Sequence, residues 1–257
     1  MIYNADLNEG FFNSLQYLNK YYGITQDPIT EDFIIIMKYY KLGSLKNYIT
    51  KNLYNIKWNV RLFILQNIVS GLKHLHNQKI IHQDFHSGNI LYENEFDIII
   101  SDLGISKSSI DNDDNEIYGV ISYMAPEILR RKGYTTASDI YSFGMIIWEL
   151  ITGRIPFWDQ NDDIGLNVKI CENFRPPIIK NAPKGYTELM QKCWDSDPNK
   201  RPTASNIYEE LLNIASVEDE NLTEIIKSPD IGPIVANNSW NNKTCRIYKK
   251  FSKSVYW

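Results

Sequence analysis

Three short stretches of the sequence carry side chains that could do acid–base or cation chemistry. IIHQDFHSGNIL (80–91) places Asp84 two positions after a histidine and Asn89 five positions after Asp84, between apolar pairs. Downstream come Asp102-Leu103-Gly104 and Ala125-Pro126-Glu127. Carboxylate and amide oxygens can accept a proton or bind a hard cation. Taken singly, each of these patterns is more often an ordinary turn.

Strands are expected on both sides of these stretches. FIIIM (33–37) is rich in β-branched residues, which predicts a buried strand. NILYE (89–93) and IIIS (98–101) predict two short strands joined by a turn. Near the start, apolar spacing over 13–19 predicts a helix.

Helices are expected over most of the remaining sequence. Ser44 is a candidate N-cap for a short helix over 45–51. Apolar residues at helical intervals predict a long amphipathic helix over 58–77. Beyond Pro126 the pattern is helical, and it is most strongly apolar over 139–152.

In this order and at these separations, the motifs resemble those of the eukaryotic protein kinase family. SDIYSFGMIIWEL and CWDSDPNKRPTA extend the resemblance, which covers about residues 10–214, and YGVISYMAPEIL looks most like the tyrosine-kinase-like group. The resemblance implies an α+β fold. Residues 1–40 would be the remnant of a small β-rich N-lobe, 41–214 a mainly helical C-lobe, and 215–257 a polar, basic tail.

The resemblance also implies a reaction, transfer of the ATP γ-phosphoryl group to a protein hydroxyl. Asp84 would be the catalytic base, and Asn89 and Asp102 would hold Mg²⁺. The apolar pairs around the loop, Ile80-Ile81 and Ile90-Leu91, would keep these side chains in place.

The resemblance also implies that the predicted strand 33–37 and the connector after it bind the nucleotide. Met37 matches the family's gatekeeper, and Lys38 and Tyr40 would offer backbone groups to the adenine edge of ATP. Leu91 matches the apolar floor beneath the base.

Other matching residues are expected to be structural. His82 should be packed and hydrogen-bonded rather than a proton shuttle. Asp139 should hydrogen-bond the backbone of the 82–89 loop, and Arg201 should pair with Glu127.

The sequence also departs from the family pattern. Too few residues precede the 13–19 helix for a Gly-rich loop and a strand lysine, and Ser14 stands where the family has Glu. Gln83 replaces the Arg that pairs with a phosphorylated activation loop, and His86 stands where Ser/Thr kinases usually carry Lys. The acceptor residue is left open, with Ser/Thr favoured over Tyr.

Three interpretations remain open. The chain could be an active kinase whose sequence lacks its true N-terminus, which the complete Asp84, Asn89 and Asp102 set favours. It could instead be an inactive pseudokinase that binds partners through its C-lobe, which Ser14 favours. As a third possibility, it could be a nonfunctional fragment with an unpaired strand edge.

Composition limits the cellular setting. A net charge of -4 over 257 residues gives no indication of a nucleic-acid partner. Three widely spaced cysteines form no disulfide or metal-ligand pattern, and no signal peptide or membrane span is recognisable. These features favour a cytoplasmic protein. The basic C-terminal tail is expected to be a flexible or loosely docked extension.

Overall fold

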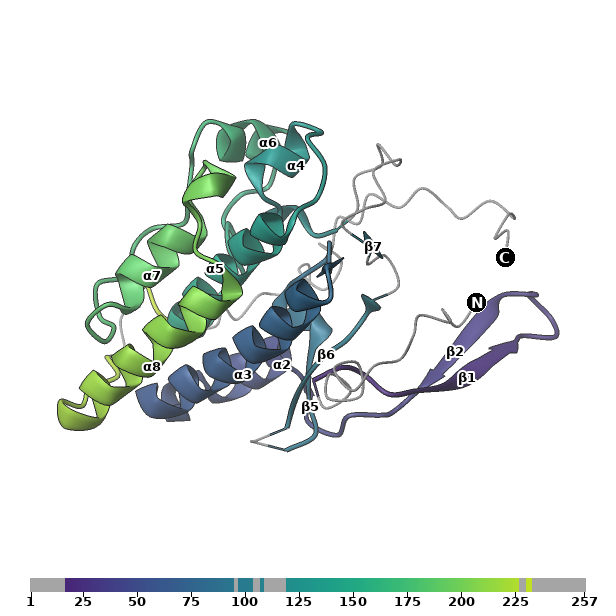
Figure 1. Cartoon of the computed structure of the whole chain (residues 1–257), viewed down its shortest axis with the longest axis horizontal. Coiled ribbons are helices and arrows are strands. Elements are labelled where there is room, and N and C mark those ends of the chain that lie inside the picture. The colour runs from purple at the N-terminus through teal and green to yellow at the C-terminus, as the bar shows by residue number, and fades with distance from the viewer. Residues whose placement is uncertain (1–16, 95–96, 104–106, 109–118, 227–229, 233–257) are drawn as a thin grey trace.

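The computed structural model describes residues 17–94, 97–103, 107–108, 119–226 and 230–232. Its main body is helical (Figure 1). The central helix α5 (Thr136–Thr152) packs against α3 (Trp58–Asn77) and α7 (Tyr186–Cys193), and α8 (Ala204–Glu220) in turn packs against α3 and α7. The long helix predicted over 58–77 is therefore confirmed.

Helix α5 is buried along almost its whole length, as its apolar sequence predicts. It starts with a capping box, in which Thr135 and Ser138 each accept a hydrogen bond from the other's backbone N–H. It ends at Gly153, whose left-handed φ of 71° suits glycine. Because a helix capped at both ends and buried on all sides has a fixed register, its polar side chains are held at fixed places in the core.

The other helices complete this body. Ser44 caps α2 (Leu45–Asn52) by accepting a hydrogen bond from the Asn47 N–H, which confirms the predicted N-cap. The remaining helical segments are α4 (Pro126–Leu129), α6 (Asp163–Cys171), and the 3-10 turns η1 (Leu53–Asn55), η2 (Ser87–Asn89), η4 (Ile121–Tyr123) and η5 (Pro198–Lys200).

A small antiparallel sheet lies beside α2 and α3. Its strand order is β3 (Gly43–Ser44), β5 (Ile90–Tyr92) and β6 (Ile98–Ile100), with Ile90 opposite Ile100. A second, two-stranded pairing joins β4 (Ile80–Ile81) to β7 (Lys107–Ser108). The strands predicted at 89–93 and 98–101 are thus confirmed. They bring the end of the 82–89 loop next to the residues that follow β6.

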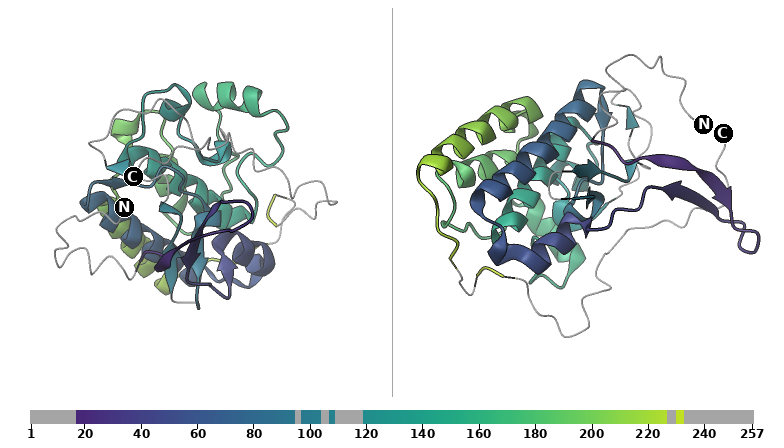
Figure 2. Two further views of the ribbon diagram at one scale, coloured as in Figure 1. Left: turned by 90° about the vertical axis from the view of Figure 1, so that its right-hand side faces the viewer. Right: turned by 90° about the horizontal axis from the view of Figure 1, so that it is seen from below.

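A separate hairpin, β1 (Tyr21–Gln26) and β2 (Phe33–Met37), projects away from the helical body (Figure 2). The strand predicted at 33–37 is confirmed, but its predicted burial is wrong, because every residue of β2 is exposed. The physical reason is that β2 pairs only with β1, and no described helix or sheet covers either face. The helix predicted over 13–19 lies mostly outside the described residues, and residues 17–19 form a turn and an isolated bridge.

After residue 214, the described part of the chain continues as helix and then contacts the body at Ile231 and Gly232. Helix α8 continues across residue 214 to Glu220. Further on, the Tyr54 hydroxyl donates to the Ile231 carbonyl at 2.6 Å, and the Gly232 N–H donates to the Thr152 carbonyl at 2.7 Å. None of the helices in the described ranges is both long and apolar enough to cross a lipid bilayer.

Candidate active site

The loop between β4 and β5 carries Asp84 and Asn89 and folds back on itself. The Asn89 side-chain amide donates to the Asp84 carbonyl at 2.9 Å and lies 3.5 Å from the Asp84 Oδ2 atom. On the other side of Asp84, the Nε2 atom of His86 lies 3.6 Å from Oδ1. The Asp84 carboxylate is therefore held close to Asn89 and His86, with part of its surface still reachable from solvent.

Asp102 is brought to the same place by the β5–β6 pairing. The Ser101 N–H donates to the Asn89 carbonyl at 2.8 Å, and the Ser101 hydroxyl donates to the same oxygen at 2.9 Å. Asp102 follows directly, is exposed, and has a left-handed φ of 63°. Ser101, next to Asp102, is thus bonded to Asn89, and Asn89 is bonded to Asp84, so the backbone places the three predicted residues at the same end of the small sheet.

Asp139 of α5 is hydrogen-bonded to the start of this loop. Its carboxylate accepts the backbone N–H groups of His82 at 2.9 Å and Gln83 at 3.1 Å. A third contact joins the same carboxylate to the His76 Nε2 atom at 3.0 Å. The predicted bond from Asp139 to the loop backbone is confirmed, and it fixes the residues immediately before Asp84.

His82 is fully buried, and its Nε2 atom lies 2.9 Å from the Ser101 carbonyl. Burial lowers the pKa of its imidazole, since the charged form is poorly solvated there. The expectation that His82 is packed and hydrogen-bonded is confirmed.

Two opposing effects act on the pKa of Asp84. Burial raises it, because the carboxylate loses solvation. The adjacent imidazole of His86, the imidazole of His82 and the backbone N–H of Val120 lower it, and together they outweigh burial. The pKa of Asp84 is therefore lowered, so the side chain is an ionised acceptor near neutral pH.

A buried polar cluster missed by the sequence analysis links the loop to α5. The Glu149 carboxylate accepts from the Ser87 hydroxyl at 2.9 Å and from the Tyr123 hydroxyl at 2.8 Å. Burial raises the pKa of Glu149, although both hydrogen bonds lower it in part. The available signal was Glu149, the one acidic residue in the apolar run 140–152 that follows Asp139. The cluster ties the catalytic-loop segment η2 to the chain segment around η4.

The expected nucleotide-binding residues follow β2 and lie along β5. Met37 ends β2, and its sulfur accepts from the Asn19 amide at 3.0 Å. The connector then runs beside β5, where Ser44 is paired with Leu91. The structure thus brings the connector and Leu91 together, as expected for a base-binding edge and floor.

Only some backbone N–H and carbonyl groups of this connector form backbone hydrogen bonds within the described residues. The Lys38 N–H donates to the Lys20 carbonyl at 2.9 Å, and the Tyr40 carbonyl accepts from the Gly43 N–H at 3.1 Å. Within the described residues, the Lys38 carbonyl and the Tyr40 N–H take part in no backbone hydrogen bond. This acceptor and this donor form a pair suited to the edge of a purine base.

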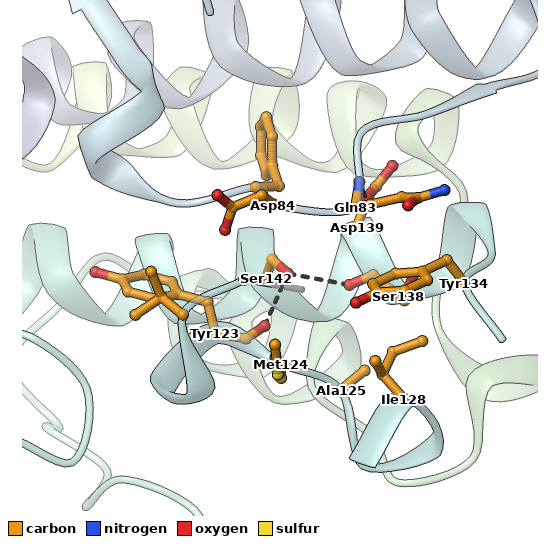
Figure 3. A pocket seen from close by; sticks show the side chains of 13 residues that line it. Gln83, Asp84, Tyr123, Met124, Ala125, Ile128, Tyr134, Ser138, Asp139 and Ser142 are labelled. Carbon is orange, nitrogen blue, oxygen red and sulfur yellow. Dashed lines mark hydrogen bonds between the residues drawn. The ribbon is translucent and has the colours of Figure 1, made fainter. Parts of the chain in front are cut away.

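A pocket opens on the side of Asp84 that faces α4 (Figure 3). Asp84 and Gln83 form one wall, and Tyr123, Met124 and Ile128 form the opposite wall. Asp102 and Asn89 do not line it. Of the three predicted residues, Asp84 is therefore the one that faces this pocket.

Gln83 supplies no positive charge beside Asp84, so we expect activity not to depend on phosphorylation of the following loop. Its N–H is used by Asp139, and its side-chain amide is neutral. The check is the phosphorylation rate after joint replacement of the loop hydroxyls, whose side chains lie outside the described residues: Ser106→Ala, Ser108→Ala, Ser109→Ala and Tyr118→Phe. A large fall in rate would contradict the expectation.

Arg201 and Glu127 form the predicted ion pair. Two parallel hydrogen bonds join the guanidinium to the carboxylate, at 2.6 and 2.7 Å. Both residues are buried. The guanidinium also donates to the backbone carbonyls of Ala137 and Asp195, so the pair joins α4, the start of α5 and the η5 region.

Comparisons with known proteins agree with this geometry. The chain is 34% identical over 197 residues to the probable serine/threonine-protein kinase roco8 of Dictyostelium discoideum, an overlap of 72% of this chain and 11% of that protein. It is 30% identical over 229 residues to receptor-interacting serine/threonine-protein kinase 4 of Mus musculus, covering 83% of this chain and 28% of that protein. It is 32% identical over 179 residues to the serine/threonine/tyrosine-protein kinase HT1 of Arabidopsis thaliana, covering 68% of this chain and 45% of that protein.

The chain thus spans less than half the length of each of these relatives. A family model described as protein tyrosine and serine/threonine kinase matches residues 12–211, which is most of the chain. The α+β fold, the loop around Asp84 and the Arg201–Glu127 pair all agree with that match. This protein therefore belongs to the protein tyrosine and serine/threonine kinase family.

Proposed function

We propose that this chain transfers the γ-phosphoryl group of ATP to a hydroxyl group of a protein substrate, and to Ser or Thr in preference to Tyr. The observation that carries the proposal is the meeting of Asp84, Asn89 and Asp102 at one end of the small sheet. Phosphoryl transfer needs mainly positioning and charge neutralisation, and these side chains offer both. The relatives' names, which include serine/threonine-protein kinase, support the choice of acceptor.

The residues present fit magnesium and ATP as partners. Within the described residues, no group of three or more His, Cys, Asp or Glu could hold a metal alone. Mg²⁺ commonly takes one or two protein oxygens and completes its shell with phosphates and water, so Asn89 and Asp102 are sufficient. When bound, the ion neutralises charge on the phosphates. Met37, Lys38, Tyr40 and Leu91 would hold the adenine.

Asp84 would act on the other substrate. The Asp84 side chain is partly exposed, so a substrate hydroxyl can reach its carboxylate, and the lowered pKa keeps that carboxylate ionised. Asp84 would accept a hydrogen bond from the substrate hydroxyl and take its proton as the hydroxyl oxygen bonds to the γ-phosphorus and the bond from that phosphorus to the leaving ADP breaks. We place this reaction in the cytoplasm, which the cysteine usage of the sequence favours.

A pseudokinase that binds partners without catalysis is the second candidate. The observation that favours it is Ser14, which stands where the resembled family has a Glu. Loss of phosphate-positioning charge would remove transition-state stabilisation. Such a protein would keep the fold. Measurements of nucleotide binding and of phosphoryl transfer would distinguish it from an active enzyme.

The experiment is a thermal-unfolding measurement with ATP, with and without Mg²⁺. We expect Mg·ATP to raise the melting temperature, because a ligand that binds only the folded state stabilises it. Asp102→Asn should remove the magnesium-dependent part of the shift, and Asp219→Asn on the exposed end of α8 should leave it unchanged. A magnesium-dependent shift that persists in Asp102→Asn would refute the metal assignment.

A further inference from the structure

Two neighbours of His86 in the loop, Gly88 and Asp84, lie against its two ring nitrogens. Its side chain is only 14% exposed, and its ring packs against Tyr123 with the centroids 5.7 Å apart. One ring nitrogen, Nδ1, accepts a hydrogen bond from the Gly88 N–H at 3.0 Å. The other, Nε2, faces Asp84 Oδ1 at 3.6 Å.

The Gly88 contact fixes the tautomer of His86. A neutral imidazole has one donor nitrogen and one acceptor nitrogen. Since Nδ1 accepts the Gly88 N–H, the ring proton belongs on Nε2, which faces the carboxylate.

Glycine at position 88 is needed for this ring position. A Cβ atom built on Gly88 would lie 2.7 Å from Cε1 and 2.8 Å from Nδ1 of His86. Its backbone is not in the left-handed region that favours glycine, so an alanine there would displace the ring without straining the chain. The missing side chain at Gly88 therefore leaves the space that the His86 ring occupies.

We propose that His86 is a positioning residue for the phosphoryl-transfer reaction, and that its Nε2–H orients the Asp84 carboxylate toward the acceptor hydroxyl. The 3.6 Å separation is longer than a hydrogen bond, as catalytic contacts often are before substrate binds. This inference rests on the proposed kinase activity.

Two variants separate orientation of Asp84 from support of the loop. Gln carries a donor near the position of Nε2 but no acceptor near Nδ1, whereas Asn carries an acceptor near Nδ1 but no donor that reaches Asp84. With saturating ATP and substrate, His86→Gln should keep kcat close to that of the unchanged protein. His86→Asn and His86→Ala should lower kcat about ten- to a hundredfold. If His86→Asn is the more active, His86 only supports the loop and the proposal is wrong.

A change at Gly88 displaces the His86 ring without altering His86 itself, so it tests the same contact independently. Gly88→Ala should lower kcat as His86→Ala does, and the double variant should be no worse than His86→Ala alone, because both changes remove the same contact. Additive losses would overturn the proposal.

Ring-nitrogen NMR of the whole chain tests the contact without any activity. We expect the proton on Nε2, and we expect Asp84→Ala to shift the Nε2 resonance more than that of Nδ1. A proton on Nδ1, or an Nε2 resonance that ignores Asp84→Ala, would reject the inference even if phosphoryl transfer is shown. Absence of transfer with the expected NMR result would reject the proposed function and leave the His86–Asp84 contact established.

Discussion

Replacing Asp84 with Asn should lower kcat for phosphoryl transfer by about a thousandfold and leave ATP binding nearly unchanged. The amide has the size and shape of the carboxylate, so the bond between Asn89 and the Asp84 backbone carbonyl should survive. It cannot take the proton of the acceptor hydroxyl. Because the loss occurs in the transition state, kcat should fall while the KM for ATP changes little.

The matched control for this change is Asp219→Asn, which makes the same replacement at an exposed position at the end of α8. Its kcat should equal that of the unchanged protein. Steady-state rates with γ-labelled ATP and a general protein substrate provide the measurement. Near-normal turnover by the Asp84 variant would mean that another group accepts the proton.

Removing Arg201 should lower the free energy of unfolding by about 3–5 kcal/mol. The Arg201→Ala change leaves the buried carboxylate of Glu127 without its two hydrogen bonds, and it also leaves the carbonyls of Ala137 and Asp195 without a donor. Glu127→Ala should have a cost of similar size, since it leaves a buried guanidinium without its counter-charge. Urea denaturation gives both values.

The exposed pair of Lys192 and Glu210 is the control for this prediction. Lys192→Ala should cost less than about 1 kcal/mol, because solvent screens an exposed pair. The Arg201→Ala/Glu127→Ala double variant should cost less than the sum of the two single changes. Additive costs, or a cost for Arg201→Ala as small as that for Lys192→Ala, would show that the buried pair is not a unit.

The sequence predicted most of the helical body because its signals are local. The amphipathic pattern of α3 and the N-cap of α2 each depend on residues within a few turns, and both elements form as expected. The exposure of β2 could not be predicted in this way. A run of β-branched residues favours a strand, but it does not say which element covers the strand.

The site was predicted only in part for a similar reason. The roles of Asp84, Asn89 and Asp102 came from the resemblance to a family, since each motif alone is compatible with a turn. The Glu149 contact with Ser87 joins residues 62 positions apart, and no periodicity reveals such a pair. The Gly88–His86 contact lies within one loop but depends on a ring orientation that only coordinates show.

The central claim is that Asp84 and Asp102 together form a magnesium-dependent phosphoryl-transfer site. The most direct measurement is transfer of labelled phosphate from ATP to a protein substrate by the purified chain, with Asp84→Asn and Asp102→Asn beside it. The account predicts transfer that requires Mg²⁺ and is lost in both variants. Binding of Mg·ATP with no transfer, or transfer that persists in either variant, would contradict it.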